Sequence, residues 1–248
     1  MYYRLFVIFF ACFSTQLWAV SISTHRVFLD KSQKTSSILV FNKESKYQDC
    51  RVYLRNYNYG IEGEITEVKG KLLPANAANK FIRHSPKKFT LAPNSQQKLN
   101  ISSRRKVNQA DGEYRSILAI SCAEEISEES ANKAVVISPR LTHNIPVIAR
   151  KGKLEAQVAI KNVSVKDNAV NFEVFRQGDR SVYGDLVLFN TLTNKIEDRI
   201  RGVSLYPGTN SKSFTLKTAL DNTRDMKLSF IEDPAYGGSI KVESAILN

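Results

Sequence analysis

The sequence predicts an all-β protein built from two β-sandwich domains, and three observations lead to this. After residue 19, short runs of β-branched and aromatic residues alternate with polar turns, which is typical of strands. No stretch carries the apolar stripe of an amphipathic helix. The runs fall into two groups of about seven or eight, and this number and spacing are typical of immunoglobulin-like sandwiches.

The two groups of strands are separated by the basic segment 150–153. Each run is bounded by turn-forming residues such as glycine, proline, asparagine and serine. Strands of the first group are expected at 22–29, 37–41, 51–55, 64–68, 89–91, 97–101, 114–122 and 135–147. Strands of the second group are expected at 154–163, 170–175, 185–190, 203–205, 214–216, 227–231 and 240–247. The polar, acidic stretch 123–133 is expected to be a loop.

Residues 1–19 have the order of a secretory signal peptide. Arg4 precedes an apolar run at 5–13, and the segment ends in the small residue Ala19, so the mature chain is expected to begin at Val20. The apolar run is nine residues long, whereas a membrane-spanning helix needs about 20. An exported protein without a membrane span is therefore expected.

Length and composition allow an N-terminal domain at 20–150 and a C-terminal domain at 151–248. With 42% hydrophobic residues, each domain can bury a core. The formal net charge is +12, but the basic residues are scattered in short groups without an aromatic-basic stripe. No nucleic-acid partner is expected. The charge is either a solvated basic face or an attraction to acidic proteins and anionic surfaces.

The sequence carries no recognisable catalytic motif. It has no GxSxG elbow, no phosphate-binding glycine loop and no HExxH. The three histidines, His25, His84 and His143, lie far apart, and no spacing suits a metal. We therefore expect no enzyme, no cofactor and no metal, although a catalytic triad assembles in space and leaves no fixed spacing in sequence.

The cysteines predict one disulfide. Cys12 leaves with the signal peptide, so Cys50 and Cys122 are the only possible intramolecular pair in an oxidising compartment. Cys50 begins a central strand and Cys122 ends the strand at 114–122, so the two meet if these strands are antiparallel neighbours. Two buried thiols are the alternative.

The strand expected at 135–147 alternates apolar and polar residues. One face carries Val135, Ile137, Pro139, Leu141, His143, Ile145 and Val147. On an edge strand, such a row beside unpaired backbone groups is a template for pairing with another chain, and proline is tolerated at edges. The alternative is that this face completes the first core. Periodicity does not choose between the two.

Several segments together resemble the periplasmic chaperones of the chaperone-usher pathway, the PapD-like family. The first is AVSISTHRVFLDKSQKTSSILVFN, with Arg26, Lys34 and Asn42 at the family's positions. The others, in order, are SPKKFTLAPNSQQKLNI, DGEYRSILAI, NIPVIARKG, RQGDRSVYGDL, VSLYPGT and FIEDPAYGG. The form of DGEYRSILAI is similar to the archaic branch of the family.

This resemblance implies an L-shaped pair of immunoglobulin-like domains located in the periplasm. The implied partners are pilin subunits and an outer-membrane usher. A pilin is an incomplete immunoglobulin fold, and the chaperone lends it an edge strand whose alternating side chains fill the client's groove. Here the side chains implied to fill that groove are Val135, Ile137, Leu141 and Ile145.

The resemblance also implies a binding site for the subunit's terminal carboxylate. Arg26 matches the family's arginine, but the position of the family's partner lysine is occupied by Pro146. Arg115, Arg140 and Arg150 remain open as substitutes for that lysine. This departure and the proline at 139 both favour the archaic branch.

Between the domains, the resemblance implies a charged cluster with changed members. The family's acidic residue aligns with Arg115 and its basic residue aligns with Asn100, while the aspartate of the second domain matches Asp233. We therefore expect an interdomain salt bridge between Arg115 and Asp233, a role that competes with Arg115 serving the carboxylate site. The alternative function is a two-domain cell-surface adhesin or binding module, since tandem sandwiches also serve that purpose.

Overall fold

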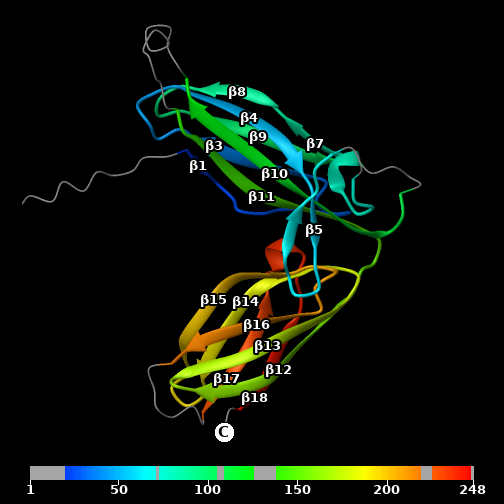
Figure 1. The fold of residues 1–248 in the computed structure, drawn as a ribbon, viewed down its shortest axis with the longest axis vertical. Coiled ribbons are helices and arrows are strands. Elements are labelled where there is room, and N and C mark those ends of the chain that lie inside the picture. The colour runs from blue at the N-terminus through cyan, green and yellow to red at the C-terminus, as the bar shows by residue number, and fades with distance from the viewer. Residues whose placement is uncertain (1–19, 71–72, 105–108, 126–137, 219–224, 247–248) are drawn as a thin grey trace, which may run out of the picture.

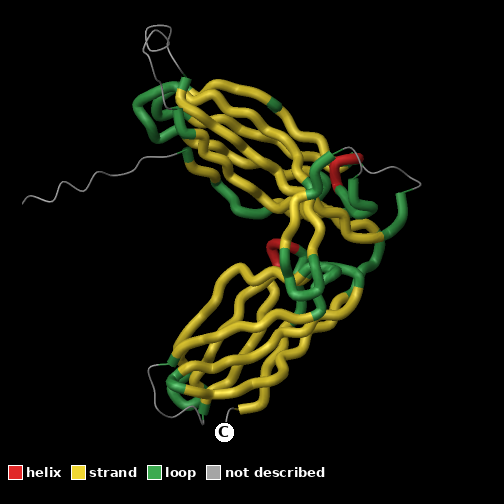
Figure 2. Tube along the Cα trace, viewed as in Figure 1, coloured by secondary structure: helices red, strands yellow, loops and turns green. Residues whose placement is uncertain are grey.

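The computed structural model describes residues 20–70, 73–104, 109–125, 138–218 and 225–246, so the expected signal peptide lies outside the described part. The predicted all-β fold with two sandwiches is confirmed (Figure 1). The long axes of the two sandwiches are inclined to each other, so the molecule is bent, and the domains meet on one side (Figure 2). No described helix is long and apolar enough to cross a membrane.

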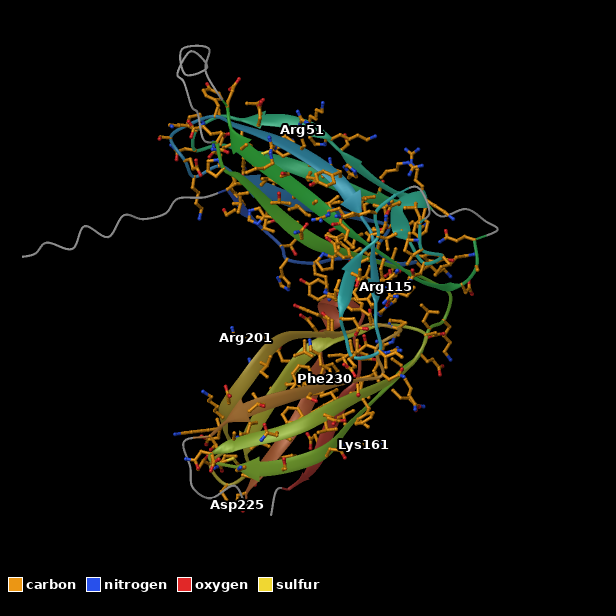
Figure 3. All side chains as sticks on the ribbon, in the orientation of Figure 1. Arg51, Arg115, Lys161, Arg201, Asp225 and Phe230 are labelled. Carbon is orange, nitrogen blue, oxygen red and sulfur yellow. A yellow bond between two sulfur atoms is a disulfide. The ribbon has the colours of Figure 1, made fainter. Side chains whose placement is uncertain are left out.

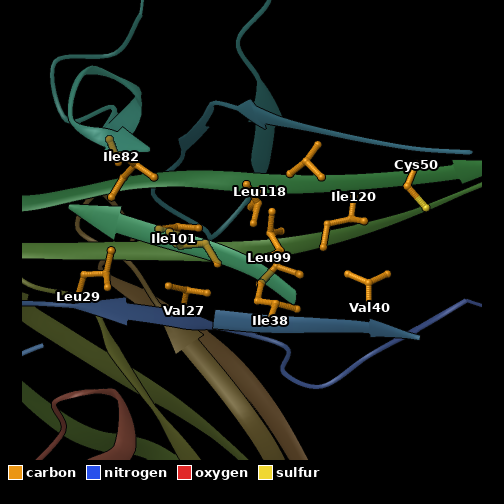
Figure 4. Packing of buried hydrophobic residues seen from close by; sticks show 14 of the residues in the cluster. Val27, Leu29, Ile38, Val40, Cys50, Ile82, Leu99, Ile101, Leu118 and Ile120 are labelled. Atoms are coloured by element: carbon orange, nitrogen blue, oxygen red, sulfur yellow. The ribbon is translucent and has the colours of Figure 1, made fainter. Parts of the chain in front are cut away.

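The first sandwich has a four-stranded sheet in the order β1-β3-β9-β7 and a five-stranded sheet in the order β2-β11-β10-β4-β8. The strands are β1 (Ser21–Ile22), β2 (Val27–Leu29), β3 (Thr35–Phe41), β4 (Gln48–Arg55), β7 (Ile82–Ser85), β8 (Lys88–Leu91), β9 (Gln96–Ser103), β10 (Gly112–Glu124) and β11 (Arg140–Lys151). Alternate side chains of both sheets face inward and form one core, because successive residues of a strand point to opposite faces (Figure 4).

The N-terminal strand changes sheet. The expected single strand at 22–29 is two strands, because the chain leaves one sheet after Ile22 and enters the other at Val27. β1 pairs antiparallel with β3, whereas β2 pairs parallel with β11. The crossing residues include His25 and Arg26, so this change of sheet brings both to the end of the sandwich that faces the second domain.

The predicted disulfide between Cys50 and Cys122 is confirmed. The two residues are direct partners in the antiparallel register of β4 and β10, with Cα atoms 4.1 Å apart. Both side chains are buried in the first core. The bond therefore links two strands of one sheet and does not tie the two sheets together.

Replacing both cysteines with alanine is expected to lower the free energy of unfolding by about 2 to 5 kcal/mol. The cross-link joins residues 72 positions apart and so restricts the unfolded chain. Urea unfolding of the oxidised wild type, the reduced wild type and the double variant measures the effect. Equal transition midpoints for the oxidised and reduced wild type would contradict it.

The second sandwich has a three-stranded sheet in the order β12-β13-β16 and a four-stranded sheet in the order β15-β14-β17-β18. Its strands are β12 (Ala156–Lys166), β13 (Ala169–Gly178), β14 (Val182–Asn190), β15 (Lys195–Leu205), β16 (Ser211–Lys217), β17 (Met226–Glu232) and β18 (Lys241–Ile246). A second, separate core lies between these sheets, and it includes Phe172 and Phe230.

A hairpin of the first domain reaches the second domain (Figure 1). It consists of β5 (Tyr57–Tyr59) and β6 (Ile65–Glu67). The ring of Tyr59 lies 4.2 Å from that of Tyr206, and Thr209 donates a hydrogen bond to the carbonyl O of Gly60 (2.9 Å). The hairpin therefore helps to fix the angle between the two domains.

Candidate functional site

Strand β11 has one open edge over its first half. It pairs with β10 along its whole length, and on the other side the parallel strand β2 covers only Val147–Ala149. Among the described residues, no strand pairs with that second edge over residues 140–146. Unpaired backbone groups at an edge can receive a strand from another chain. His143 keeps its side chain near this edge by donating to the carbonyl O of Val20 (2.8 Å).

The structure describes two of the four side chains expected to fill a client's groove. Leu141 is 43% exposed, so it is available to another chain. Ile145 is 0% exposed and belongs to the first core. The expectation that Ile145 fills a groove on a client is wrong, because this side chain already completes its own domain. Val135 and Ile137 lie outside the described residues.

A pocket of about 560 Å³ lies between the domains. The first domain contributes His25, Arg26 and Pro146 to its lining, and the second contributes Tyr183, Asp185, Arg201, Gly202, Ser204 and Asp233. Pro146 is also the last residue of the open edge of β11. A strand added along that edge would therefore end at the pocket that contains Arg26.

Arg26 is held in this pocket by neutral groups of the second domain. It is 5% exposed, and its Nη2 donates to the Ser204 hydroxyl (2.6 Å) and to the Tyr206 hydroxyl (3.1 Å). Its guanidinium carbon lies 4.0 Å from the centre of the Tyr183 ring. Among the described residues, no carboxylate forms an ion pair with Arg26. A buried cation without a counter-ion is costly, so this position favours binding of an anion.

Tyr183 adds an uncharged wall to the pocket. Burial raises the pKa of its hydroxyl, and the opposing effect of Arg26 is smaller, so the group is neutral at physiological pH. The hydroxyl lies 2.6 Å from His25 Nε2. The aromatic face toward the guanidinium stabilises the cation without neutralising it.

The contact between the domains is built around Glu113. This carboxylate accepts hydrogen bonds from the backbone N–H and the hydroxyl of Ser181 (2.9 and 2.8 Å) and from Arg150 Nε (3.0 Å). Arg150 also donates to the carbonyl O atoms of Ser181 (2.8 Å) and Gly237 (3.1 Å). Burial lowers the pKa of Arg150, and Glu113 partly opposes this. Arg150 is therefore used to join the domains and does not line the pocket.

The expected salt bridge between Arg115 and Asp233 is absent among the described residues. Arg115 donates to the carbonyl O of Pro207 (3.3 Å) and lies over the ring of Tyr59, with Glu113 3.9 Å from its Nε. Asp233 instead caps the short helix η2 (Pro234–Tyr236) by accepting from the N–H of Ala235 (2.9 Å). The Arg115 side chain is buried in the contact between the domains, so it does not line the pocket that contains Arg26 either.

A buried ion pair supports the second-domain side of this contact. Arg180 donates two hydrogen bonds to the carboxylate of Glu232 (2.6 and 3.0 Å), which also accepts the N–H groups of Ser239 and Ile240. Desolvation raises the pKa of Glu232, but these hydrogen bonds outweigh it and the pKa is lowered. The pair fixes the loop that follows β17, beside the residues that contact Arg150.

No family model and no curated protein matches the sequence. Among solved structures, the crystal structure of the YadV chaperone is similar, with 13% identity, a TM-score of 0.50, and 91% of this chain and 98% of that chain covered. The chain has the fold of a chaperone-usher chaperone.

Two further solved structures contain chaperones bound to other proteins. The CsuC–CsuE chaperone–tip adhesion subunit complex of Acinetobacter baumannii is 12% identical (TM-score 0.49, with 91% of this chain and 97% of that chain covered). The SafB chaperone in complex with the SafA pilin of Salmonella enterica is 17% identical (TM-score 0.49, with 94% of this chain and 99% of that chain covered).

The sequence indicates Arg26 as a binding residue, but it does not indicate the residues that surround Arg26, which lies in the crossing between β1 and β2. Tyr183, Ser204 and Tyr206 come from the second domain, more than 150 positions away in sequence. They lie in the segments RQGDRSVYGDL and VSLYPGT, which signalled resemblance but no role. No feature of the sequence predicts a binding role for Arg201, because an arginine in a charged segment is typical of a solvent-exposed strand. Only the packing of two domains brings these groups together.

Proposed function

We propose that the protein is a periplasmic chaperone that binds pilus subunits by lending them strand β11 and delivers them to an outer-membrane usher. The observation that carries the proposal is the open edge of β11, which ends at a pocket with a buried, uncompensated arginine. An extended segment of a client can pair with the edge while its terminal carboxylate binds Arg26. The fold comparison supports the same role.

The direction of the client strand follows from this arrangement. β11 runs toward the pocket from Arg140 to Pro146. A client strand whose last residue lies at Arg26 therefore runs parallel to β11, as β2 does. Backbone hydrogen bonds along the edge supply affinity for any sequence, and exposed apolar side chains such as Leu141 supply fit. The same role requires no catalytic group, so we propose that the protein is not an enzyme.

Arg26 and the proposed donor strand have separate tasks. The guanidinium recognises the end of the client chain, because it can donate two parallel hydrogen bonds to one carboxylate. The strand covers apolar surface that an incomplete subunit exposes. Burial of one large apolar side chain contributes about 1.5 to 3 kcal/mol before the cost of ordering. Of the four side chains expected to fill the client's groove, Leu141, Val135 and Ile137 remain part of the proposal.

Periplasmic co-expression with a pilin subunit of a chaperone-usher pilus tests the function. Wild type is expected to keep the subunit soluble and to co-purify with it. Leu141→Asp is expected to reduce the recovered complex at least about tenfold, because a charge enters an apolar groove. Leu192→Asp is the matched control, since Leu192 is 75% exposed in the second domain.

Two outcomes would contradict the proposal. Equal recovery of complex with wild type and Leu141→Asp would show that β11 is not the strand lent to the subunit. A chain that binds no subunit but is found on the cell surface would instead support the two-domain adhesin.

A further inference from the structure

The pocket between the domains contains a second guanidinium, and it comes from the other domain. Arg201 lies on β15 and lines the same pocket as the first-domain residues Arg26 and Pro146. Figure 3 shows Arg201 on the side of the second domain that faces the first. The side chain is exposed, and among the described residues none forms an ion pair with it.

A β-bulge sets the direction of the Arg201 side chain. Gly184 pairs with Val203 and Leu186 pairs with Ile200, so the single residue Asp185 lies opposite two residues, Arg201 and Gly202. Gly202 has φ +70°, a conformation that favours glycine. Its N–H donates to Asp185 Oδ1 (3.1 Å), which fixes the bulge.

Without this bulge, Arg201 would face the core. Val203 and Leu205 point into the second core, and strict alternation would send residue 201 to the same face. The extra residue places Ile200 against the core and leaves Arg201 on the pocket side. Bulges commonly re-aim side chains beside functional sites.

The carboxylates of the pocket do not neutralise the two arginines. Asp185 bonds the N–H of Gly202 and lies 3.9 Å from Arg199 Nε, and Asp233 caps η2. Arg26 contacts only hydroxyl groups and aromatic rings among the described residues. Two cations of the pocket are therefore available to an added anion.

The geometry points to Arg201 as the second cation that binds the client's terminal carboxylate, in place of a basic residue on β11. This inference rests on the proposed chaperone function. The carboxylate then lies between Arg26 of one domain and Arg201 of the other. Client recognition is thereby shared between the two domains, and Pro146 provides the wall where a cation on β11 would otherwise lie.

Binding of a small carboxylate probe to the intact protein tests this inference. N-acetyl-glycyl-phenylalanine and its C-terminal amide are titrated into isotope-labelled protein at constant ionic strength, and NMR shifts give the dissociation constants. Wild type is expected to bind the free acid more tightly than the amide. Arg201→Gln is expected to weaken binding of the free acid about tenfold and to leave binding of the amide unchanged.

Lys195→Gln is the matched control, because it removes the same charge from the same strand outside the pocket. It is expected to change the affinity less than about twofold. Unfolding curves of both variants should coincide with wild type, since Arg201 is exposed.

The outcomes separate this inference from the proposed function. If Arg201→Gln and Lys195→Gln bind the free acid with the same affinity while Arg26→Gln no longer binds it, Arg201 has no part in the site. The role of Arg26 then stands. If wild type does not distinguish the free acid from the amide, the pocket is no carboxylate site and the inference fails with it. The donor role of β11 is then still decided by the Leu141 co-expression experiment.

Discussion

Arg26→Ala is expected to abolish the recovery of soluble subunit in periplasmic co-expression. Two charge-assisted hydrogen bonds to a carboxylate are lost, which corresponds to about 3 kcal/mol or roughly a hundredfold in affinity. The loss is large because the guanidinium is buried and has no counter-ion among the described residues, so a carboxylate is a much better partner for it than the neutral groups of Ser204, Tyr206 and Tyr183.

Arg26 also contacts the second domain, so its variants need a control for folding. Thermal unfolding followed by circular dichroism shows whether Arg26→Ala is still folded. Arg26→Lys keeps the charge but loses the two-pronged geometry, and an intermediate recovery is expected. Lys34→Ala removes an exposed charge from the same domain and should leave recovery unchanged. A folded Arg26→Ala variant that recovers as much subunit as wild type would remove Arg26 from the site.

Glu113→Ala is expected to lower the free energy of unfolding by about 3 to 5 kcal/mol. The carboxylate is 1% exposed and lies between the buried Arg115 and the partly buried Arg150. Its removal takes a carboxylate away from beside both cations and leaves the N–H of Ser181 without its acceptor. The contact between the domains should weaken before either core does.

Urea unfolding followed by intrinsic fluorescence measures this effect, with small-angle scattering to follow the angle between the domains. Glu155→Ala is the control, because Glu155 forms an exposed ion pair with Lys153 that contributes about 0 to 1 kcal/mol. A double-mutant cycle that combines Glu113→Ala with Arg150→Ala gives the coupling free energy of this ion pair, apart from the other hydrogen bonds of Glu113. A loss no larger than that of Glu155→Ala would show that Glu113 is not central to the contact.

The sequence predicted most strands because alternation of apolar residues reports which face a strand buries. β5 and β7 were missed, since each is short and neither shows an apolar alternation. The strand expected at 203–205 begins eight residues earlier in the structure, because the segment KIEDRIRG is charged and forms an edge. The change of sheet between Ile22 and Val27 leaves no trace in periodicity, because the two strands have only two and three residues, too few to show a pattern.

The candidate site was harder to predict because it depends on how the two domains pack. Alternation put Leu141 and Ile145 on one face, but only the extent of the core decides that one is exposed and the other buried. Asp233 was expected to form a salt bridge with Arg115 of the other domain, yet its carboxylate accepts a hydrogen bond from the nearby N–H of Ala235. The boundary expected after residue 150 remains a prediction, and β11 continues to Lys151.

The parallel strand β2 occupies the same edge of β11 that a client would use, and it begins at Val27, directly after Arg26. A guest strand and β2 would thus lie end to end along β11, with no room for the guest backbone to continue past Pro146. A segment from the middle of a protein has to continue and would collide with β2, whereas a segment that stops there fits. The arrangement therefore discriminates between the end of a chain and its interior, whatever side chains that end carries.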